Sequence, residues 1–177
     1  MRSVVCSSFA PLDQLQIVEQ DSPPMKPGHV RVAVRACGVN FVDALMAQGL
    51  YQIKPPLPYV PGGESVGIVT EVADDVAAAG TGPALGQRVL VGGGIGGFTT
   101  EMVVHATRAV AVPDVLTDTQ AATFLQSYGT AYFALHERAK LAAGQWLLVL
   151  GAGGGVGLGA VDVGHALGLQ VIAAAST

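Results

Sequence analysis

Residues 147–157 have the residue types and spacing of a turn that binds nucleotide phosphates. An apolar run at 147–150 breaks into glycines and then resumes a helical pattern, as at the start of a dinucleotide-binding unit. Glycines let backbone N–H groups approach a pyrophosphate, and the following helix offers its unpaired N–H groups and positive dipole end to the same anion. The sequence therefore predicts a cofactor-binding turn made of Ala152, Gly153, Gly154, Gly155, Val156 and Gly157.

The residues around this turn fit one strand–helix–strand unit. Residues 171–175 form a second apolar run at the distance expected of the next parallel strand. Between the runs, one helical stripe carries the apolar residues Val156, Ala160, Val163 and Leu167. A ligand-free helical hairpin rich in glycine and alanine is the alternative interpretation.

The end of the second strand indicates which dinucleotide to expect. NAD-binding folds usually carry Asp or Glu there, about 20 residues beyond the turn, to accept from the ribose hydroxyls. This chain has Ser176 there, followed by Thr177. No carboxylate repels a 2′-phosphate and two hydroxyls can donate to it, so the sequence favours NADPH over NADH. Alternatively the strand end is merely polar, and basic residues outside this chain decide the matter.

The predicted nucleotide-binding sheet is small, because the chain ends at Thr177 together with its second strand. Parallel sheets normally have helices on both faces, and two strands cannot bury both. We therefore expect the rest of the nucleotide-binding domain to exist, in a longer gene product or as a separate piece bound to this one.

The composition is typical of a soluble globular protein. The net charge is −4 and no cluster of Lys and Arg occurs, which argues against nucleic acid and anionic membranes as partners. Residues 141–161 carry no charge, but their central glycines suit a phosphate turn better than a lipid-exposed helix. The N-terminus lacks the apolar core of a secretory signal, which predicts a cytoplasmic location. Two cysteines are too few for a disulfide framework or a four-cysteine zinc site.

Three regions of the chain have different patterns, and together they predict a mixed β and α/β fold. Residues 1–115 contain short β-branched runs between Gly/Pro turns, which favour a small β-barrel. Its expected strands are 3–6, 29–37, 65–72, 88–91, 99–105 and 109–112, with a helix at 40–48. Residues 116–144 form the connecting helices, capped at Thr117 or Asp118 and with a possible break near Gly129. Residues 145–177 begin the dinucleotide-binding domain.

Several short motifs, most of which contain glycine, follow one another in a fixed order. They are Gly38-Val39-Asn40-Phe41-Val42-Asp43, Gly49-Leu50-Tyr51, Pro61-Gly62-Gly63-Glu64, Gly86-Gln87-Arg88-Val89, Thr130-Ala131-Tyr132 and Gly154-Gly155-Val156-Gly157. This order resembles the medium-chain dehydrogenase/reductase superfamily, in particular its zinc-free, zeta-crystallin-like quinone oxidoreductase branch. The resemblance covers nearly the whole chain. It implies a GroES-like barrel followed by a Rossmann domain, of which this chain has the N-terminal half, and a homodimer at full length.

The resemblance also allows the metal positions to be compared. Where zinc-dependent relatives carry a Cys, a His and a further Cys, this chain has Asn40, Gly63 and, less certainly aligned, Gln126. None of these is an ordinary zinc ligand. We therefore expect no metal. Cys37 is expected to be a small core residue.

Without a Lewis acid to stabilise an alkoxide, the expected reaction is hydride transfer from NADPH to a quinone or an α,β-unsaturated carbonyl. The resemblance places Asn40 and Tyr51 near nicotinamide and substrate as hydrogen-bond donors, although Tyr51 could equally be a pocket wall. It places Thr130 close to the nicotinamide, with an ordinary helix hydroxyl as the alternative. Asp43 and Glu64 also match the family, and a structural role is favoured for both.

Two other functions remain open from the sequence. An enoyl-thioester reductase would share the fold and the hydride chemistry. A nucleotide-binding structural or interaction protein would bind the dinucleotide without turnover.

Overall fold

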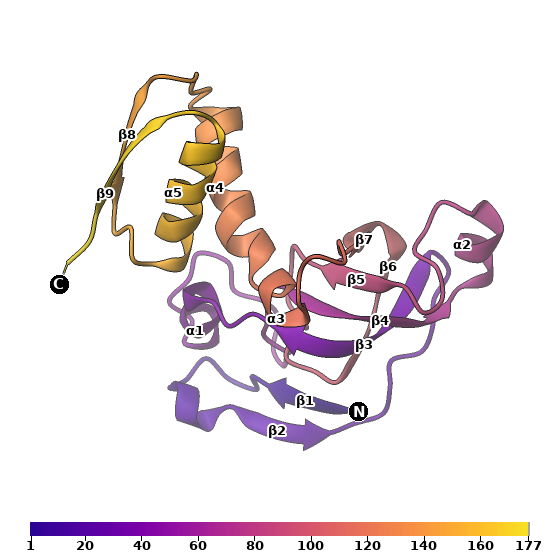
Figure 1. Cartoon of the computed structure of the whole chain (residues 1–177). Helices are drawn as coiled ribbons and strands as arrows, with labels where there is room; N and C mark the ends of the chain where they lie inside the picture. Colours follow the sequence, from indigo (N-terminus) through magenta and orange to yellow (C-terminus); the bar gives the residue numbers. More distant parts are fainter. Residues whose placement is uncertain (177) are drawn as a thin grey trace. The chain divides into compact units, whose positions relative to one another are not determined.

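The computed structural model describes residues 1–176 and divides into two compact units, Met1–Thr123 and Phe124–Thr177. Figure 1 labels their helices and strands. Within residues 1–176, no helix combines the length and the apolar character needed to cross a membrane.

The first unit is built on a five-stranded antiparallel sheet with the order β6-β3-β4-β5-β7. Its strands are β3 (His29–Cys37), β4 (Ser65–Val72), β5 (Arg88–Val91), β6 (Glu101–His105) and β7 (Ala109–Ala111). β3 pairs with β6 on one side and with β4 on the other, and its last residue, Cys37, pairs with Ser65. The end of β3 and the start of β4 are therefore held together.

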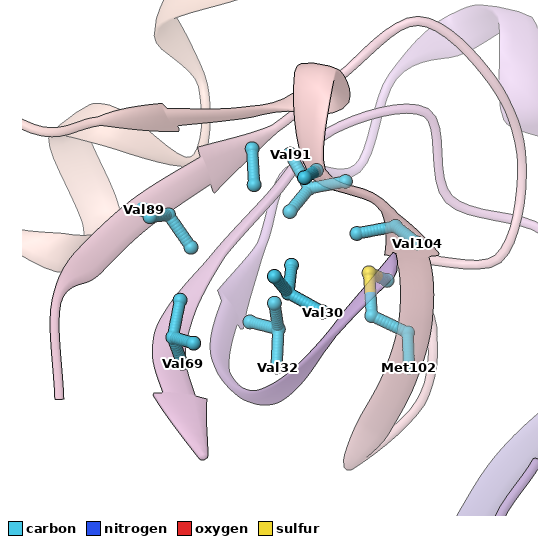
Figure 2. Close-up of a cluster of buried hydrophobic side chains, with 9 residues drawn as sticks. Val30, Val32, Val69, Val89, Val91, Met102 and Val104 are labelled. Carbon is cyan, nitrogen blue, oxygen red and sulfur yellow. The ribbon is translucent and has the colours of Figure 1, made fainter. Parts of the chain in front are cut away.

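One face of this sheet encloses the main core. Alternate residues of each strand point to this face, because successive side chains in a strand point to opposite sides. Figure 2 shows these side chains directed toward one another inside the curved sheet. The core consists of Val30, Val32, Val69, Val89, Val91, Met102, Val104, Ala106 and Ala109.

The other face of the sheet is covered by the helix α3 (Asp118–Ala121) and the residues around it. Val66 of β4 and Leu90 of β5 point to this face and pack with Ala121 and Ala122. Thr117 caps α3, since its side-chain oxygen accepts from the backbone N–H of Gln120 at 3.3 Å. The sequence prediction of a cap at this position is confirmed.

Smaller elements complete the first unit. β1 (Arg2–Val5) pairs antiparallel with β2 (Gln16–Glu19), α1 (Phe41–Ala47) follows β3, and α2 (Asp74–Ala79) follows β4. The predicted strands at 29–37, 65–72 and 88–91 are confirmed at both ends, and the other three differ by one or two residues. The sequence did not indicate β2 or α2.

The second unit has a helical segment followed by a strand–helix–strand unit. Its elements are π-helical turns at Leu125–Gly129 and Phe133–Arg138 on either side of α4 (Thr130–Tyr132), then β8 (Trp146–Leu150), α5 (Gly155–Ala166) and β9 (Gln170–Ala174). β8 and β9 are parallel, and α5 packs against both strands and against α4 (Figure 1). The Tyr128 hydroxyl donates to Asp162 of α5 at 2.6 Å.

Two expectations for the second unit are wrong in detail. The helix does not break near Gly129, which has helical φ and ψ angles of −62° and −42°. The helix α5 exists, but Val156 of the predicted apolar stripe is 46% exposed, and the buried residues of α5 are Gly159 and Gly164. Glycines make this contact because the helix lies too close to its neighbours for larger residues. A Cβ atom on Gly164 would lie 2.9 Å from Leu147 and Val171.

Candidate functional site

The glycine turn joins β8 to α5, as the sequence predicted, and its geometry separates its glycines into two kinds. Gly151 has a φ of 71°, which favours glycine, and a Cβ atom on Gly157 would lie 2.3 Å from the Gly151 carbonyl oxygen. These two glycines form the turn itself. Gly153 and Gly154 face open space instead, since Cβ atoms there would have no neighbour nearer than 3.9 Å and 3.5 Å.

The N-terminus of α5 is free to bind an anion. Gly154 is its cap residue and no side chain accepts a hydrogen bond there. The first N–H groups of a helix have no partner within the helix, so those that follow Gly154 are available donors. Open glycines and unpaired N–H groups are what a pyrophosphate needs. The turn therefore fits a dinucleotide cofactor.

The end of β9 lies beside this turn. The Ala152 N–H donates to the Ala174 carbonyl at 3.0 Å, and a Cβ atom on Gly153 would lie 3.9 Å from that of Ala175. Ser176 follows directly and is exposed. The structure thus brings the strand end to the edge that holds the turn, while Thr177 lies outside the described residues.

The helical segment before β8 contributes a serine that the sequence analysis missed. A Cβ atom on Gly155 would lie 3.1 Å from the Ser127 hydroxyl, and one on Gly159 would lie 3.1 Å from the Ser127 carbonyl oxygen. Thr130, the residue predicted near the nicotinamide, is exposed one helical turn further along the same segment. No signal in the sequence pointed to Ser127, because its place beside the turn depends on the packing of this segment against α5.

Asn40, in the first unit, is surrounded by buried carboxyl groups. It is the cap residue of α1 and follows the end of β3 by three residues. Its side-chain Nδ2 donates to Glu64 Oε1 at 3.1 Å, and its backbone N–H donates to Asp43 Oδ2 at 2.8 Å. Glu64 and Asp43 are 2% and 6% exposed. The other oxygen of Asp43, Oδ1, accepts from the Gly62 N–H at 3.3 Å.

Burial raises the pKa of Asp43, while hydrogen bonds from the backbone N–H groups of Asn40, Gly62 and Gly63 act in the opposite direction. The carboxyl group therefore joins the start of α1 to the loop before β4. This agrees with the structural role that the sequence favoured for Asp43.

Asp43→Asn is expected to lower the free energy of unfolding by about 1–3 kcal/mol, because the amide must turn a donor toward one of these N–H groups. The pH dependence has a definite sign. The pKa of Asp43 is raised in the folded state, so the folded protein binds this proton more tightly than the unfolded chain does. The stabilisation that results is fully present below the ordinary aspartate value of about 4 and is lost as the pH rises through the raised pKa.

Urea unfolding at several pH values measures both effects. Asp75→Asn, at an exposed acid of α2, is the matched control and should change little. Equal stability of Asp43→Asn and the wild type would contradict the bridging role.

Tyr51 lies beyond the other end of α1, four residues after Ala47, and is half-buried. A seven-residue helix is about 10 Å long, so Asn40 and Tyr51 flank its two ends. Among residues 1–176, no hydrogen bond links the Tyr51 hydroxyl to another residue of the chain. Its hydroxyl is therefore free to donate.

The residues at the family's metal positions do not form a donor set. Asn40 is bonded to two carboxyl groups, and Gly63 has no side chain. Within residues 1–176, no three His, Cys, Asp or Glu side chains gather closely enough to hold a metal ion. The nearby Cys37 thiol instead donates to the Glu64 carbonyl at 3.0 Å.

Comparison with known proteins shows to which protein class this architecture belongs. A family model described as the alcohol dehydrogenase GroES-like domain matches residues 26–114, which include β3 to β7 and the Asn40–Glu64 pair. The first unit is thus a GroES-like half-barrel, and the second contains the short parallel strand–helix unit that follows it in that class.

Individual relatives narrow the class. A quinone oxidoreductase-like protein 2 homolog of Nematostella vectensis is 42% identical over 177 residues, which cover 98% of this chain and 47% of that protein. A polyketide synthase of Streptomyces halstedii is 41% identical over 93% of this chain and 3% of its own length. The quinone oxidoreductase of Thermus thermophilus, solved also in complex with NADPH, has a TM-score of 0.86 and 33% identity, covering 100% of this chain and 54% of that one.

The chain therefore belongs to the medium-chain dehydrogenase/reductase superfamily, in its quinone oxidoreductase-like branch. It spans about half the length of the quinone oxidoreductase-like relatives it matches. The fold class and the family resemblance predicted from the sequence are confirmed.

Proposed function

We propose that the complete gene product reduces a quinone or an α,β-unsaturated carbonyl with NADPH and without a metal ion. The observation that carries this proposal is the open glycine turn at the uncapped start of α5. The Thermus thermophilus relative, a quinone oxidoreductase solved also in complex with NADPH, supports it. A homodimer is proposed for the complete protein.

NADPH, when bound, supplies the hydride. On this chain, the turn from Ala152 to Gly157 would hold the pyrophosphate through its unpaired N–H groups, chiefly those that follow Gly154, and Ser176 would donate to the 2′-phosphate. Thr130 lies on the segment that packs against α5 and is proposed to contact the nicotinamide.

The acceptor oxygen gains negative charge as hydride adds to the conjugated system. A hydrogen-bond donor aimed at that oxygen lowers the barrier because it binds the charge that develops in the transition state. Asn40 and Tyr51 are the proposed donors, Asn40 through its amide and Tyr51 through its hydroxyl. The residues at the metal positions are not ordinary zinc ligands, so these donors are proposed to take the place of a bound Lewis acid.

An NADPH oxidation assay with a simple benzoquinone and a simple enone tests the proposal. Turnover is expected with at least one acceptor, and it is expected to persist in a metal chelator. Elemental analysis should find no stoichiometric zinc. One tightly bound zinc per chain, lost together with activity, would overturn the metal-free reaction, and NADPH binding without any turnover would favour the non-catalytic alternative.

Reduction of an enoyl thioester is the second candidate, and the match to a polyketide synthase favours it. The hydride chemistry is the same, but the acceptor carries a thioester carbonyl. A crotonyl thioester in the same assay separates the two functions. A kcat/KM at least tenfold higher for the thioester than for any quinone would favour this candidate.

Ser176→Asp is expected to shift the cofactor preference from NADPH toward NADH. A carboxylate at the end of β9 would replace a charge-assisted hydrogen bond with repulsion, so NADPH affinity should fall at least about tenfold. NADH should bind as well or better, because its ribose hydroxyls can donate to the new carboxylate. Steady-state kinetics with both cofactors measures the change, with Ser176→Asn as the uncharged control. An unchanged ratio would mean that other residues bind the phosphate.

A further inference from the structure

Two buried carboxyl groups fix Asn40 from two directions. Asp43 accepts from its backbone N–H, and Glu64 accepts from its side-chain amide. A carboxylate oxygen accepts hydrogen bonds and does not donate them, so the NH₂ end of the Asn40 amide must be the end that faces Glu64. The amide group is planar. Once one of its N–H bonds points at Glu64, the directions of the second N–H and of the carbonyl oxygen are also set.

We propose that Glu64 is a positioning residue that orients the Asn40 amide for the acceptor or the nicotinamide. The proposal rests on the proposed function, in which Asn40 is a donor. Glu64 itself is not proposed to touch the reacting atoms, because it is 2% exposed and its Oε1 accepts from the Asn40 amide. With one amide N–H bonded to Glu64, the second is left for the ligand.

The position of Glu64 is itself set by the sheet. Its backbone carbonyl accepts from the Gly38 N–H at 3.1 Å and from the Cys37 thiol at 3.0 Å. The next residue, Ser65, pairs with Cys37 at the end of the β3–β4 ladder. Glu64 and Asn40 therefore extend from the same closing pair of strands, and neither depends on a long loop for its place.

Gly38 leaves the space that the Glu64 side chain needs. A Cβ atom on Gly38 would lie 3.1 Å from both Cγ and Oε1 of Glu64, and 2.3 Å from the Ala122 carbonyl oxygen. A larger residue would displace the carboxylate or the backbone around it. The glycine of the first motif is thus explained chiefly by the close Ala122 backbone, and in addition by the path of the glutamate side chain toward Asn40.

A double-mutant cycle tests this role. Glu64→Met keeps the approximate length of the side chain but removes the acceptor, so kcat should fall about 10- to 100-fold through misplacement of the amide. In an Asn40→Ala background the same substitution should change kcat less than about twofold, since there is no amide left to orient. Glu64→Gln, which retains an acceptor oxygen, should lose less than about threefold. Thermal unfolding verifies that each variant is folded.

If Glu64→Met lowered kcat by the same factor in the wild type and in Asn40→Ala, the positioning role would be overturned and Glu64 would be a structural acid. A loss in Glu64→Gln as large as that in Glu64→Met would overturn it too, because the acceptor would then not be the group that matters. If the wild type turns over but the double-mutant cycle shows no coupling between positions 64 and 40, this inference alone is refuted. No NADPH-dependent turnover in the wild type refutes the proposed function and this role with it.

A second measurement does not depend on activity. The two side-chain N–H resonances of Asn40, assigned as the pair missing in Asn40→Ala, should be widely separated by NMR because one of them is bonded to a carboxylate. Glu64→Met should bring them toward the values of an exposed asparagine. Unchanged resonances in that variant would show that Glu64 does not hold the amide, which overturns the inference whatever the kinetics.

Discussion

Gly154→Val is expected to lower the affinity for NADPH at least about 100-fold while the protein stays folded. A Cβ atom at this position has its nearest neighbour at 3.5 Å, which is ordinary van der Waals contact, so the turn itself has room for a Cβ atom. The branched side chain would occupy the open space through which a pyrophosphate must approach the backbone N–H groups. Loss of the glycine cap costs the helix only about 1 kcal/mol.

Titration of the complete protein with NADPH measures this effect, and circular dichroism verifies folding. Gly157→Ala is the matched contrast in the same turn. Its Cβ atom would meet the Gly151 carbonyl oxygen at 2.3 Å, so this variant should lose stability as well as binding. Unchanged NADPH affinity in folded Gly154→Val would mean that the pyrophosphate binds elsewhere.

Cys37 is expected to react with iodoacetamide about 10³-fold more slowly than an ordinary thiol at pH 8. Burial, followed by the negative charges of Asp43 and Glu64, raises the pKa of Cys37 to about 12. Only the thiolate is nucleophilic, so the small thiolate fraction limits the rate. The rate should rise about tenfold per pH unit as the pH increases toward the pKa.

Peptide mass spectrometry after timed alkylation distinguishes Cys37 from Cys6, and the same reaction in urea gives the unfolded reference. Alkylation of the folded protein at the rate of the unfolded one would contradict the raised pKa. A slow reaction would also show that the environment at the end of β3, beside Asp43 and Glu64, disfavours negative charge on sulfur.

The sequence predicted the central strands well because they satisfy local and global requirements together. β3 carries valines at alternating positions 30, 32 and 34, and this alternation matches the side chains that point into the core. β2 has no such pattern: Ile17, its largest apolar residue, is 76% exposed. Its strand conformation depends on pairing with β1, which local sequence does not show.

The candidate site could be predicted only in part, for a similar reason. The cofactor turn is continuous in the chain, so its residues were visible together. The contact between Asn40 and Glu64 joins residues 24 positions apart through the register of two strands. Ser127 reaches the turn through helix packing, which neither residue type nor spacing reveals.

Since Cys37 and Ser65 close the β3–β4 ladder, local opening of the Asn40 region must disrupt the edge of the most strongly paired part of the sheet. Amide hydrogen exchange at Gly38, whose N–H is bonded to the Glu64 carbonyl, should therefore be nearly as slow as in the middle of β3. On heating, order around Asn40 should be lost together with the whole unit and not in an earlier transition. Asn40 is thus expected to belong to the rigid scaffold, so a gating motion would have to come from other parts of the protein.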